Sequence, residues 1–170
     1  MIRIVTESMS DFTQEEAKAA DLIVMPLPIR FGMEEYWDDG VSLTQDDFYA
    51  RLRVAKELPK TSQVPVEHYR KCFNRLLENP EDEVLVITGS SKLSGCYQSA
   101  CIAREACHDP ARVTVLDSLN ATCAEYMLVD QALRYRREGV SNMQTMLAKL
   151  RDVMAHYKIC LLYTSPSPRD

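Results

Sequence analysis

The sequence predicts an α/β domain with three layers, in which a largely parallel sheet lies between helices. Short apolar runs alternate with longer amphipathic stretches, and this alternation is typical of strands joined by crossover helices. The length of 170 residues suits one ordinary domain. Apolar residues make up 46% of the sequence, a share typical of a folded globular chain.

Three apolar runs are predicted to form buried strands, at residues 2–5, 83–87 and 112–116. A further extended segment covers residues 22–25 and 28–31 and is interrupted by proline.

Six helices are predicted between and after these strands. Thr13 followed by Glu16 forms a capping box that begins the first helix, and Thr44 with Asp47 caps the second in a similar way. The other four have apolar faces at helical spacing: Val66, Tyr69, Phe73, Leu76 and Leu77; Leu93, Tyr97, Ala100 and Cys101; Ala121, Ala124, Leu128, Ala132 and Tyr135, ending near Gly139; and Met143, Met146, Leu147, Leu150, Val153 and Met154. A row of methionines can line a binding groove, but this spacing favours a core face.

Composition and charge exclude several classes of protein. A net charge of −5 without a basic stripe argues against nucleic acid as a partner. No apolar run approaches the roughly 20 residues of a transmembrane segment, and the first residues lack a signal-peptide pattern. The six cysteines contain no Cys-x-x-Cys pair and most fall on predicted helices, so we expect reduced core thiols in a cytoplasmic protein.

Hydroxyl-rich segments follow each of the three buried strands, at residues 6–11, 88–95 and 117–122, and a fourth lies at residues 61–63. The carboxyl ends of parallel strands form one rim, where helices begin with unpaired N–H groups. Hydroxyls beside those amides make a neutral cradle for a small anion such as a carboxylate. The same residues are also the favoured helix caps, so the pattern leaves an anion site and simple capping both open.

Other functional motifs do not match. Gly89 and Gly95 lie six residues apart and are not followed by the Lys-Ser/Thr of a phosphate-binding loop, and the segment lacks the second glycine of a nucleophile elbow. His68 and Cys72 lie one helical turn apart, but no further ligand is spaced to complete a metal site. The remaining histidines have no recognisable catalytic partner. We therefore expect no metal, no cofactor and no catalytic residues.

The same loops resemble the DegV family, in order and spacing, from residue 1 to about residue 159. The resemblance is carried by Thr-Glu-Ser-Met-Ser-Asp at 6–11, Met-Pro-Leu at 25–27 with Asp-Gly at 39–40, Leu-Pro-Lys-Thr-Ser-Gln at 58–63, Ser-Ser-Lys-Leu-Ser-Gly-Cys-Tyr-Gln-Ser-Ala at 90–100, and Val-Leu-Asp-Ser at 115–118. The family's own patterns include Leu-Pro-x-Thr-Ser-Gln and Ser-Ser-x-Leu-Ser-Gly-Thr-Tyr-Gln-Ser-Ala.

The resemblance implies an α/β front domain followed by a smaller second domain, with a long-chain fatty acid held between them. Its carboxylate would contact Thr61 and Ser94 directly. The residues implied around these two are Ser8, Ser62, Ser91, Gly95, Ser118 and Asn120. The family further implies a carrier that performs no chemistry itself. A separate fatty-acid kinase would convert the presented carboxylate to an acyl phosphate for phospholipid synthesis.

The sequence departs from the family pattern in several places. Glu7 replaces the usual aspartate, and we expect it to keep the negative charge. Residues 124–128 lack the glycine often found at the start of the fifth helix. Residues 160–170 have no periodic pattern and resemble a non-native tail left by a sequencing or translation artefact. The expected organisation is therefore a front domain at residues 1–159, with the second domain missing.

Two alternatives remain beside the carrier. The serine-rich rim could belong to a small acyl- or phosphoryl-transfer enzyme, which would need a general base near Ser94. A front domain cut from its second domain could also have no function of its own, in which case it would expose apolar surface and aggregate or bind hydrophobic dyes.

Overall fold

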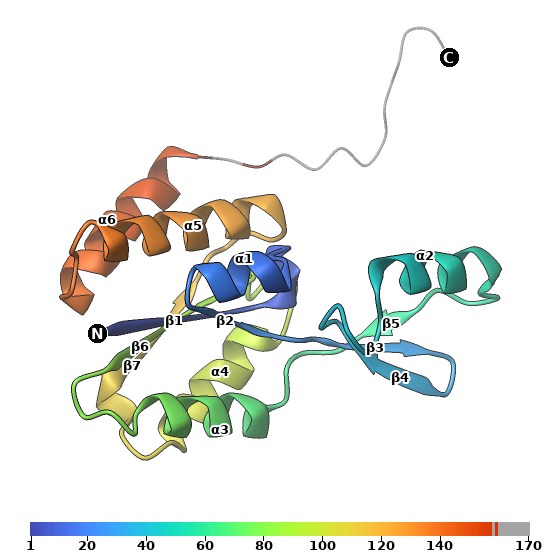
Figure 1. Cartoon of the computed structure of the whole chain (residues 1–170), viewed down its shortest axis with the longest axis horizontal. Helices are drawn as coiled ribbons and strands as arrows, with labels where there is room; N and C mark the ends of the chain where they lie inside the picture. The colour runs from blue at the N-terminus through green and yellow to red at the C-terminus, as the bar shows by residue number, and fades with distance from the viewer. Residues whose placement is uncertain (158, 160–170) are drawn as a thin grey trace, which may run out of the picture.

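The structure is a computed structural model that describes residues 1–157 and residue 159. A four-stranded sheet lies between two layers of helices, and a smaller three-stranded sheet with one helix lies to one side (Figure 1). The chain thus has the expected three-layer α/β architecture, with an additional small sheet that the sequence did not indicate.

The central sheet is entirely parallel, with strand order β2-β1-β6-β7. Its strands are β1 (Ile2–Glu7), β2 (Leu22–Met25), β6 (Glu83–Thr88) and β7 (Val113–Asp117). The three predicted buried strands are therefore confirmed, with ends that differ by one or two residues. Because all four strands run the same way, the carboxyl ends of β1, β6 and β7 lie next to one another.

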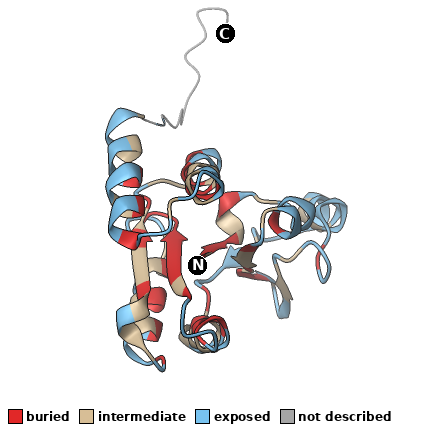
Figure 2. Ribbon diagram, turned by 60° about the vertical axis from the view of Figure 1, so that its left-hand side comes forward, coloured by how far each residue is buried: buried red, intermediate tan, exposed pale blue. Residues whose placement is uncertain are grey.

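Helices cover both faces of this sheet. Two of them, α3 (Val66–Leu76) and α4 (Cys96–Glu105), pack on the face to which Val5, Val84 and Val86 point. Figure 2 shows the buried residues gathered in the sheet and on the helix sides turned toward it.

The opposite face carries the other three helices of the main body: α1 (Gln14–Ala19), α5 (Cys123–Arg137) and α6 (Met143–His156). Met143 and Met146 are buried there. The methionine row therefore forms core, as its spacing favoured, rather than a groove.

The second sheet is antiparallel, with order β4-β3-β5. It contains β3 (Pro28–Phe31), β4 (Glu34–Trp37) and β5 (Lys60–Thr61), and α2 (Gln45–Val54) lies beside it without a buried residue. Residues 22–31 were expected to form one interrupted extended segment, whereas its two halves belong to different sheets. Pro26 lacks the N–H that would continue the ladder after β2. β4 and β5 were missed because they are short and carry mostly exposed polar side chains.

Two helix faces need correction. Leu93 was assigned to the fourth helix, but it lies in the turn before α4 and is 65% exposed. The buried residues of α4 are Cys96, Ser99, Ala100 and Ala103. The fourth helix starts late because Leu93 and Ser94 both donate their N–H to the Ser90 carbonyl, at 2.9 and 3.0 Å. Ala121 likewise precedes α5, which begins at Cys123.

The predicted caps are confirmed at the first helix and in part at the second. Thr13 accepts the Glu16 N–H at 3.2 Å and donates its own N–H to the Glu16 carboxylate at 2.9 Å, which is the complete capping box. Thr44 accepts the Asp47 N–H at 3.2 Å, but its hydroxyl, rather than its backbone, contacts the Asp47 carboxylate.

The five described cysteines are all free thiols. Cys72, Cys96 and Cys107 are buried, Cys101 is partly buried and Cys123 is exposed. Cys160 and the tail predicted at residues 160–170 lie outside the described residues. None of the helices in the described part of the chain has the length and apolar character that crossing a bilayer requires.

Candidate functional site

The loops that follow β1, β6 and β7 are joined by backbone hydrogen bonds. Ser90 donates its N–H to the Asn120 carbonyl at 2.7 Å, which ties the second loop to the third. Thr122 donates its N–H to the Met9 carbonyl at 3.1 Å, which ties the third loop to the first. The predicted rim of three hydroxyl-rich loops is therefore present as one connected surface.

Ser94 lies on this rim immediately before α4. Its Oγ accepts the N–H of Cys96 at 3.2 Å, and its own N–H is bonded to Ser90. Its hydroxyl also lies beside the Cys96 thiol and lowers the pKa of that thiol, and among the described residues it donates to no carbonyl oxygen. Ser94 therefore presents a fixed hydroxyl, with a hydrogen to donate, at the positive end of a ten-residue helix.

Thr61 belongs to the small sheet. It is the last residue of β5 and pairs with Ile29 of β3, and its side chain is exposed. Ser62 continues the pairing by donating its N–H to the Pro28 carbonyl at 3.1 Å. Among the described residues, the Thr61 hydroxyl has no hydrogen-bond partner, so it too is available to a ligand.

The segment at residues 61–63 lies against the loop that carries Ser94. The side chain of Gln63 fills the space above Gly95, and a Cβ added to Gly95 would lie 1.6 Å from Gln63 Oε1. The next residue, Val64, donates its N–H to the Cys96 sulfur at 3.4 Å. The tertiary structure thus brings together the two segments that the sequence analysis singled out for direct ligand contact.

Several of the surrounding candidates hold the loops rather than face outward. Ser8 Oγ accepts the Leu27 N–H at 3.1 Å. The Ser118 hydroxyl and the Asn120 side chain bond within their own turn, at 3.1 and 2.8 Å. Ser62 and Ser91 are exposed, and in the described part of the chain their hydroxyls make no hydrogen bond.

Helix capping accounts for part of this pattern, since Ser94 Oγ accepts the N–H of Cys96, the first residue of α4. The N-cap residues of α3, α4 and α5 are Pro65, Gly95 and Thr122, and none of them makes a side-chain capping hydrogen bond. Thr122 also has a left-handed φ of 51° with ψ of −130°, which is strained for a β-branched residue.

Two buried carboxyl groups lie beneath the rim. Burial raises the pKa of Glu7 to about 7, although hydrogen bonds from Gly89 and Tyr69 lower it. Burial also raises the pKa of Glu125 to about 9, and the nearby Glu7 adds to this shift. Burial thus works against the expected negative charge of Glu7, whereas its hydrogen bonds from Gly89 and Tyr69 favour that charge. Sequence reasoning missed Glu125, although a glutamate between Ala124 and Leu128 on an apolar face was the available signal.

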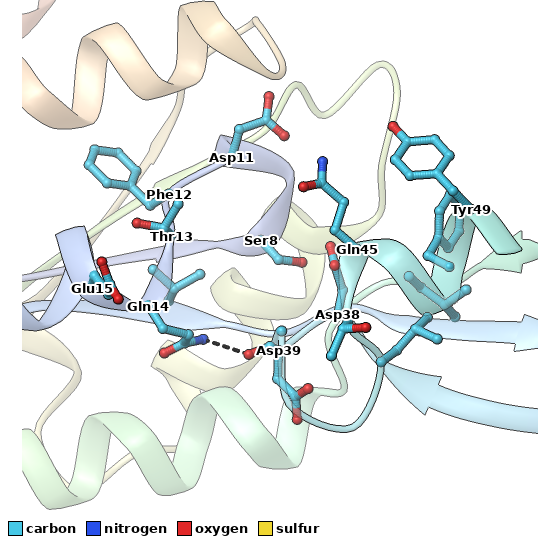
Figure 3. A pocket seen from close by; sticks show the side chains of 16 residues that line it. Ser8, Asp11, Phe12, Thr13, Gln14, Glu15, Asp38, Asp39, Gln45 and Tyr49 are labelled. Atoms are coloured by element: carbon cyan, nitrogen blue, oxygen red, sulfur yellow. Dashed lines mark hydrogen bonds between the residues drawn. The ribbon is translucent and has the colours of Figure 1, made fainter.

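A cavity of about 780 Å³ lies elsewhere, between the loop after β1 and α2 (Figure 3). Four carboxyl groups line it, those of Asp11, Glu15, Asp38 and Asp39, together with apolar side chains that include Phe12. Thr61 and Ser94 are not among its lining residues. Its negative charge does not suit a carboxylate head group.

A metal centre is not formed by the described residues, in which no three His, Cys, Asp or Glu side chains are grouped to hold an ion. His68 packs its ring on Trp37, with centroids 5.0 Å apart. This packing gives His68 a structural role.

Comparisons with known proteins agree on one family. Residues 1–165 match the family described as "Uncharacterised protein, DegV family". A DegV domain-containing protein of Caldanaerobacter subterraneus is 36% identical over 168 residues, which cover 95% of this chain and 59% of that protein.

Two solved structures are similar to this chain. One, from Thermus thermophilus, is described as fatty acid binding of a DegV family protein; it has a TM-score of 0.80 and 30% identity, over 91% of this chain and 53% of its own. The other is a stearic acid-binding protein from Eubacterium ventriosum, with a TM-score of 0.80 and 30% identity. The match covers 89% of this chain and 52% of that protein. The chain thus spans about half to three fifths of the length of these relatives.

Proposed function

Because the chain belongs to the DegV family, we propose that it is the front domain of a carrier that binds a long-chain fatty acid. The carboxylate of the fatty acid is held by the hydroxyls of Thr61 and Ser94. The support from relatives is that two similar structures are described as binding fatty acids. The observation that carries the proposal is the packing of Gln63 on Gly95, because it sets the segment of Thr61 beside the loop of Ser94.

The chemistry of this rim suits a carboxylate better than a phosphate or a metal ion. Two hydroxyls with hydrogens to donate, next to a helix N-terminus, stabilise one negative charge without a lysine or arginine. Ser62, Ser91 and Gly95 complete the surface around them. Ser8, Ser118 and Asn120 support it from within the loops.

We propose that the second wall of the site comes from a domain that follows residue 159 in the natural protein. The support is that the relatives extend well beyond the matched region. Residues 160–170 would then be a non-native tail. An independent read of the gene through the codon for Ile159 tests this, since a frame that continues into a second domain is expected and a stop after Asp170 would contradict it.

We also propose that the carrier is not itself an enzyme, needs no cofactor, and presents its ligand in the cytoplasm to a separate fatty-acid kinase. Ser94 Oγ is bonded to the backbone of Cys96 and, within the described residues, to no base that could activate it. The free cysteines agree with a reducing compartment.

The function is tested by mass spectrometry of solvent extracts from the purified complete gene product. A co-purifying long-chain acid is expected in the wild type and in Ser141→Ala, a control that removes an exposed hydroxyl between α5 and α6. The acid is expected at much lower occupancy in Thr61→Ala and Ser94→Ala. A well-folded wild type without an acyl chain above background would overturn the proposal. A burst of product from an activated ester, abolished by Ser94→Ala, would favour the acyl-transfer enzyme instead.

A further inference from the structure

Glu7 and Glu125 form a buried acidic pair directly under Gly89, the first residue of the loop that carries Ser94. Glu7 is the last residue of β1, Glu125 lies in the first turn of α5, and both side chains are fully buried. Glu7 Oε1 and Glu125 Oε2 lie 3.1 and 3.0 Å from the point where a side chain on Gly89 would begin. The two carboxyl groups therefore meet beneath one backbone position.

The two carboxyl groups have different partners. Glu7 accepts two hydrogen bonds, from the Gly89 N–H at 2.7 Å and from the Tyr69 hydroxyl at 3.1 Å. Glu125 accepts one, from the Thr6 hydroxyl at 3.0 Å, while its Oε2 has no partner among the described residues. Two donors favour the charged form of Glu7, and the open Oε2 of Glu125 is the place for a proton. Glu125 is thus the neutral acid of the pair, and Glu7 is the group that gains or loses charge near neutral pH.

The groups around the pair do not neutralise it. Glu7 faces the Tyr69 hydroxyl of α3, the Cys96 thiol of α4, the Asp117 carboxylate of β7 and Glu125 of α5. Glu125 also faces Asp11 of the loop after β1 and the phenol of Tyr157 after α6. The main shifts of the pKa of Glu7 and Glu125 come from burial, hydrogen bonds and neighbouring acidic groups, with no lysine, arginine or histidine among them. A charge on Glu7 is therefore felt at the rim without a nearby cation to cancel it.

We propose that Glu7 is a positioning residue for the loop of Ser94, and that binding of a carboxylate at this loop is coupled to proton uptake by Glu7. This inference rests on the proposed function, since it takes the rim as the head-group site. The charged Glu7 holds Gly89 by its N–H and at the same time repels an anion on the outer side of the loop. Protonation of Glu7 removes the repulsion, so the carboxylate binds more tightly as the pH falls.

The expected size of the coupling follows from the charge alone. A unit charge within about 10 Å changes an anion's binding constant by roughly tenfold at an effective dielectric constant near 20. The affinity should therefore rise by up to about tenfold as the pH is lowered from 8.5 to 6, with a fraction of a proton taken up per ligand bound near pH 7.

The test is calorimetric titration of the complete gene product with palmitate, below its solubility limit, at several pH values and in two buffers of different ionisation enthalpy. The wild type is expected to show the affinity change and the proton uptake. Glu7→Gln should bind with little dependence on pH, and Glu7→Asp should restore the dependence. Glu125→Gln is the matched control, because it replaces a carboxyl group that stays neutral, and it should retain the pH dependence.

Each result decides between the two proposals. Palmitate binding by the wild type with constant affinity and no proton uptake would overturn the coupling and leave the fatty-acid function intact. If the pH dependence of palmitate affinity is lost in Glu125→Gln but kept in Glu7→Gln, the assignment of the proton uptake to Glu7 is overturned. No palmitate binding by folded wild type at any pH would overturn both. The wild-type measurement decides the coupling even if Glu7→Gln does not fold.

Discussion

The side chain of Gln63 lies directly over Gly95, so close that a Cβ on Gly95 would meet Gln63 Cδ at 2.7 Å. These residues are 32 positions apart and belong to different hydroxyl-rich segments. Their contact sets the spacing between Thr61 and Ser94.

Gly95→Ala should destabilise the domain by about 1–3 kcal/mol, because the new methyl group requires Gln63 to move. Gly95 has a φ of −80°, so the cost comes from crowding and not from the backbone. The free energy of unfolding from urea titration measures it. The double variant Gln63→Ala/Gly95→Ala should regain most of the loss. A Gly95→Ala cost that remains unchanged in the Gln63→Ala background would show that the contact is not its cause.

Thr61→Ala and Ser94→Ala should each weaken fatty-acid binding by roughly 1.5–3 kcal/mol, the contribution of a hydrogen bond to a charged group. The two losses should not simply add, since both hydroxyls serve one carboxylate. The dissociation constant of palmitate measures the effect, with Ser141→Ala as the control. Equal affinity in wild type and Ser94→Ala would place the head group elsewhere.

The stability of the domain should fall as the pH rises through neutrality. Folding raises the pKa of Glu7 and Glu125 from 4.5 to about 7 and about 9, so the folded protein keeps protons that the unfolded chain has already released. The free energy of unfolding therefore decreases from about pH 4.5 upward.

Glu125→Gln should reduce the decrease of the free energy of unfolding with rising pH, because glutamine has no proton to lose. Near pH 8 the variant should be more stable than the wild type, by a few kcal/mol, and near pH 4.5 the difference should be small. Urea titrations at the two pH values measure it. A variant less stable than wild type at pH 8 would show that Glu125 is held as a charged group.

Thr122→Gly should stabilise the domain by roughly 1 kcal/mol or less. Thr122 has a φ of 51° and a ψ of −130°, a conformation that glycine adopts without strain, while the added freedom of glycine in the unfolded chain offsets part of the gain. The backbone bond from Thr122 to the Met9 carbonyl does not depend on the side chain. A clear loss of stability would mean that the Thr122 side chain contributes a contact that outweighs the strain.

The 170-residue chain should bind a hydrophobic dye more strongly than the complete gene product. Leu58, Leu93 and Leu119 are 81, 65 and 58% exposed, and they flank the segments that carry Thr61, Ser94 and Ser118. Fluorescence of an anilinonaphthalene sulfonate dye compares the two proteins, and Leu93→Ser/Leu119→Ser should lower the signal of the short chain. Equal, negligible dye binding by both proteins would argue against an uncovered face.

The local sequence pattern was enough to predict most helices and strands of the main body. The apolar runs that became β1 and β6 are buried on both faces, and that of β7 is partly buried at the sheet edge; a continuous apolar run is the local signal for such strands. The capping box of Thr13 and Glu16 could also be predicted from the sequence, since both residues lie within one helical turn. β4 was missed although it forms a local hairpin with β3, because its side chains are mostly exposed, and β5 was missed because its two residues pair with β3 from a distant part of the chain.

The sequence by itself determined the class of fold, the three hydroxyl-rich loops and their common rim, because these depend on periodicity and on the direction of parallel strands. Only the tertiary structure decided that Gln63 packs on Gly95 and that Glu7 meets Glu125 across 118 positions of sequence. The raised pKa of Glu125 depends on burial and on that meeting, and neither can be inferred from the residues next to it in the sequence. Desolvation and contact between distant segments are properties of the folded chain.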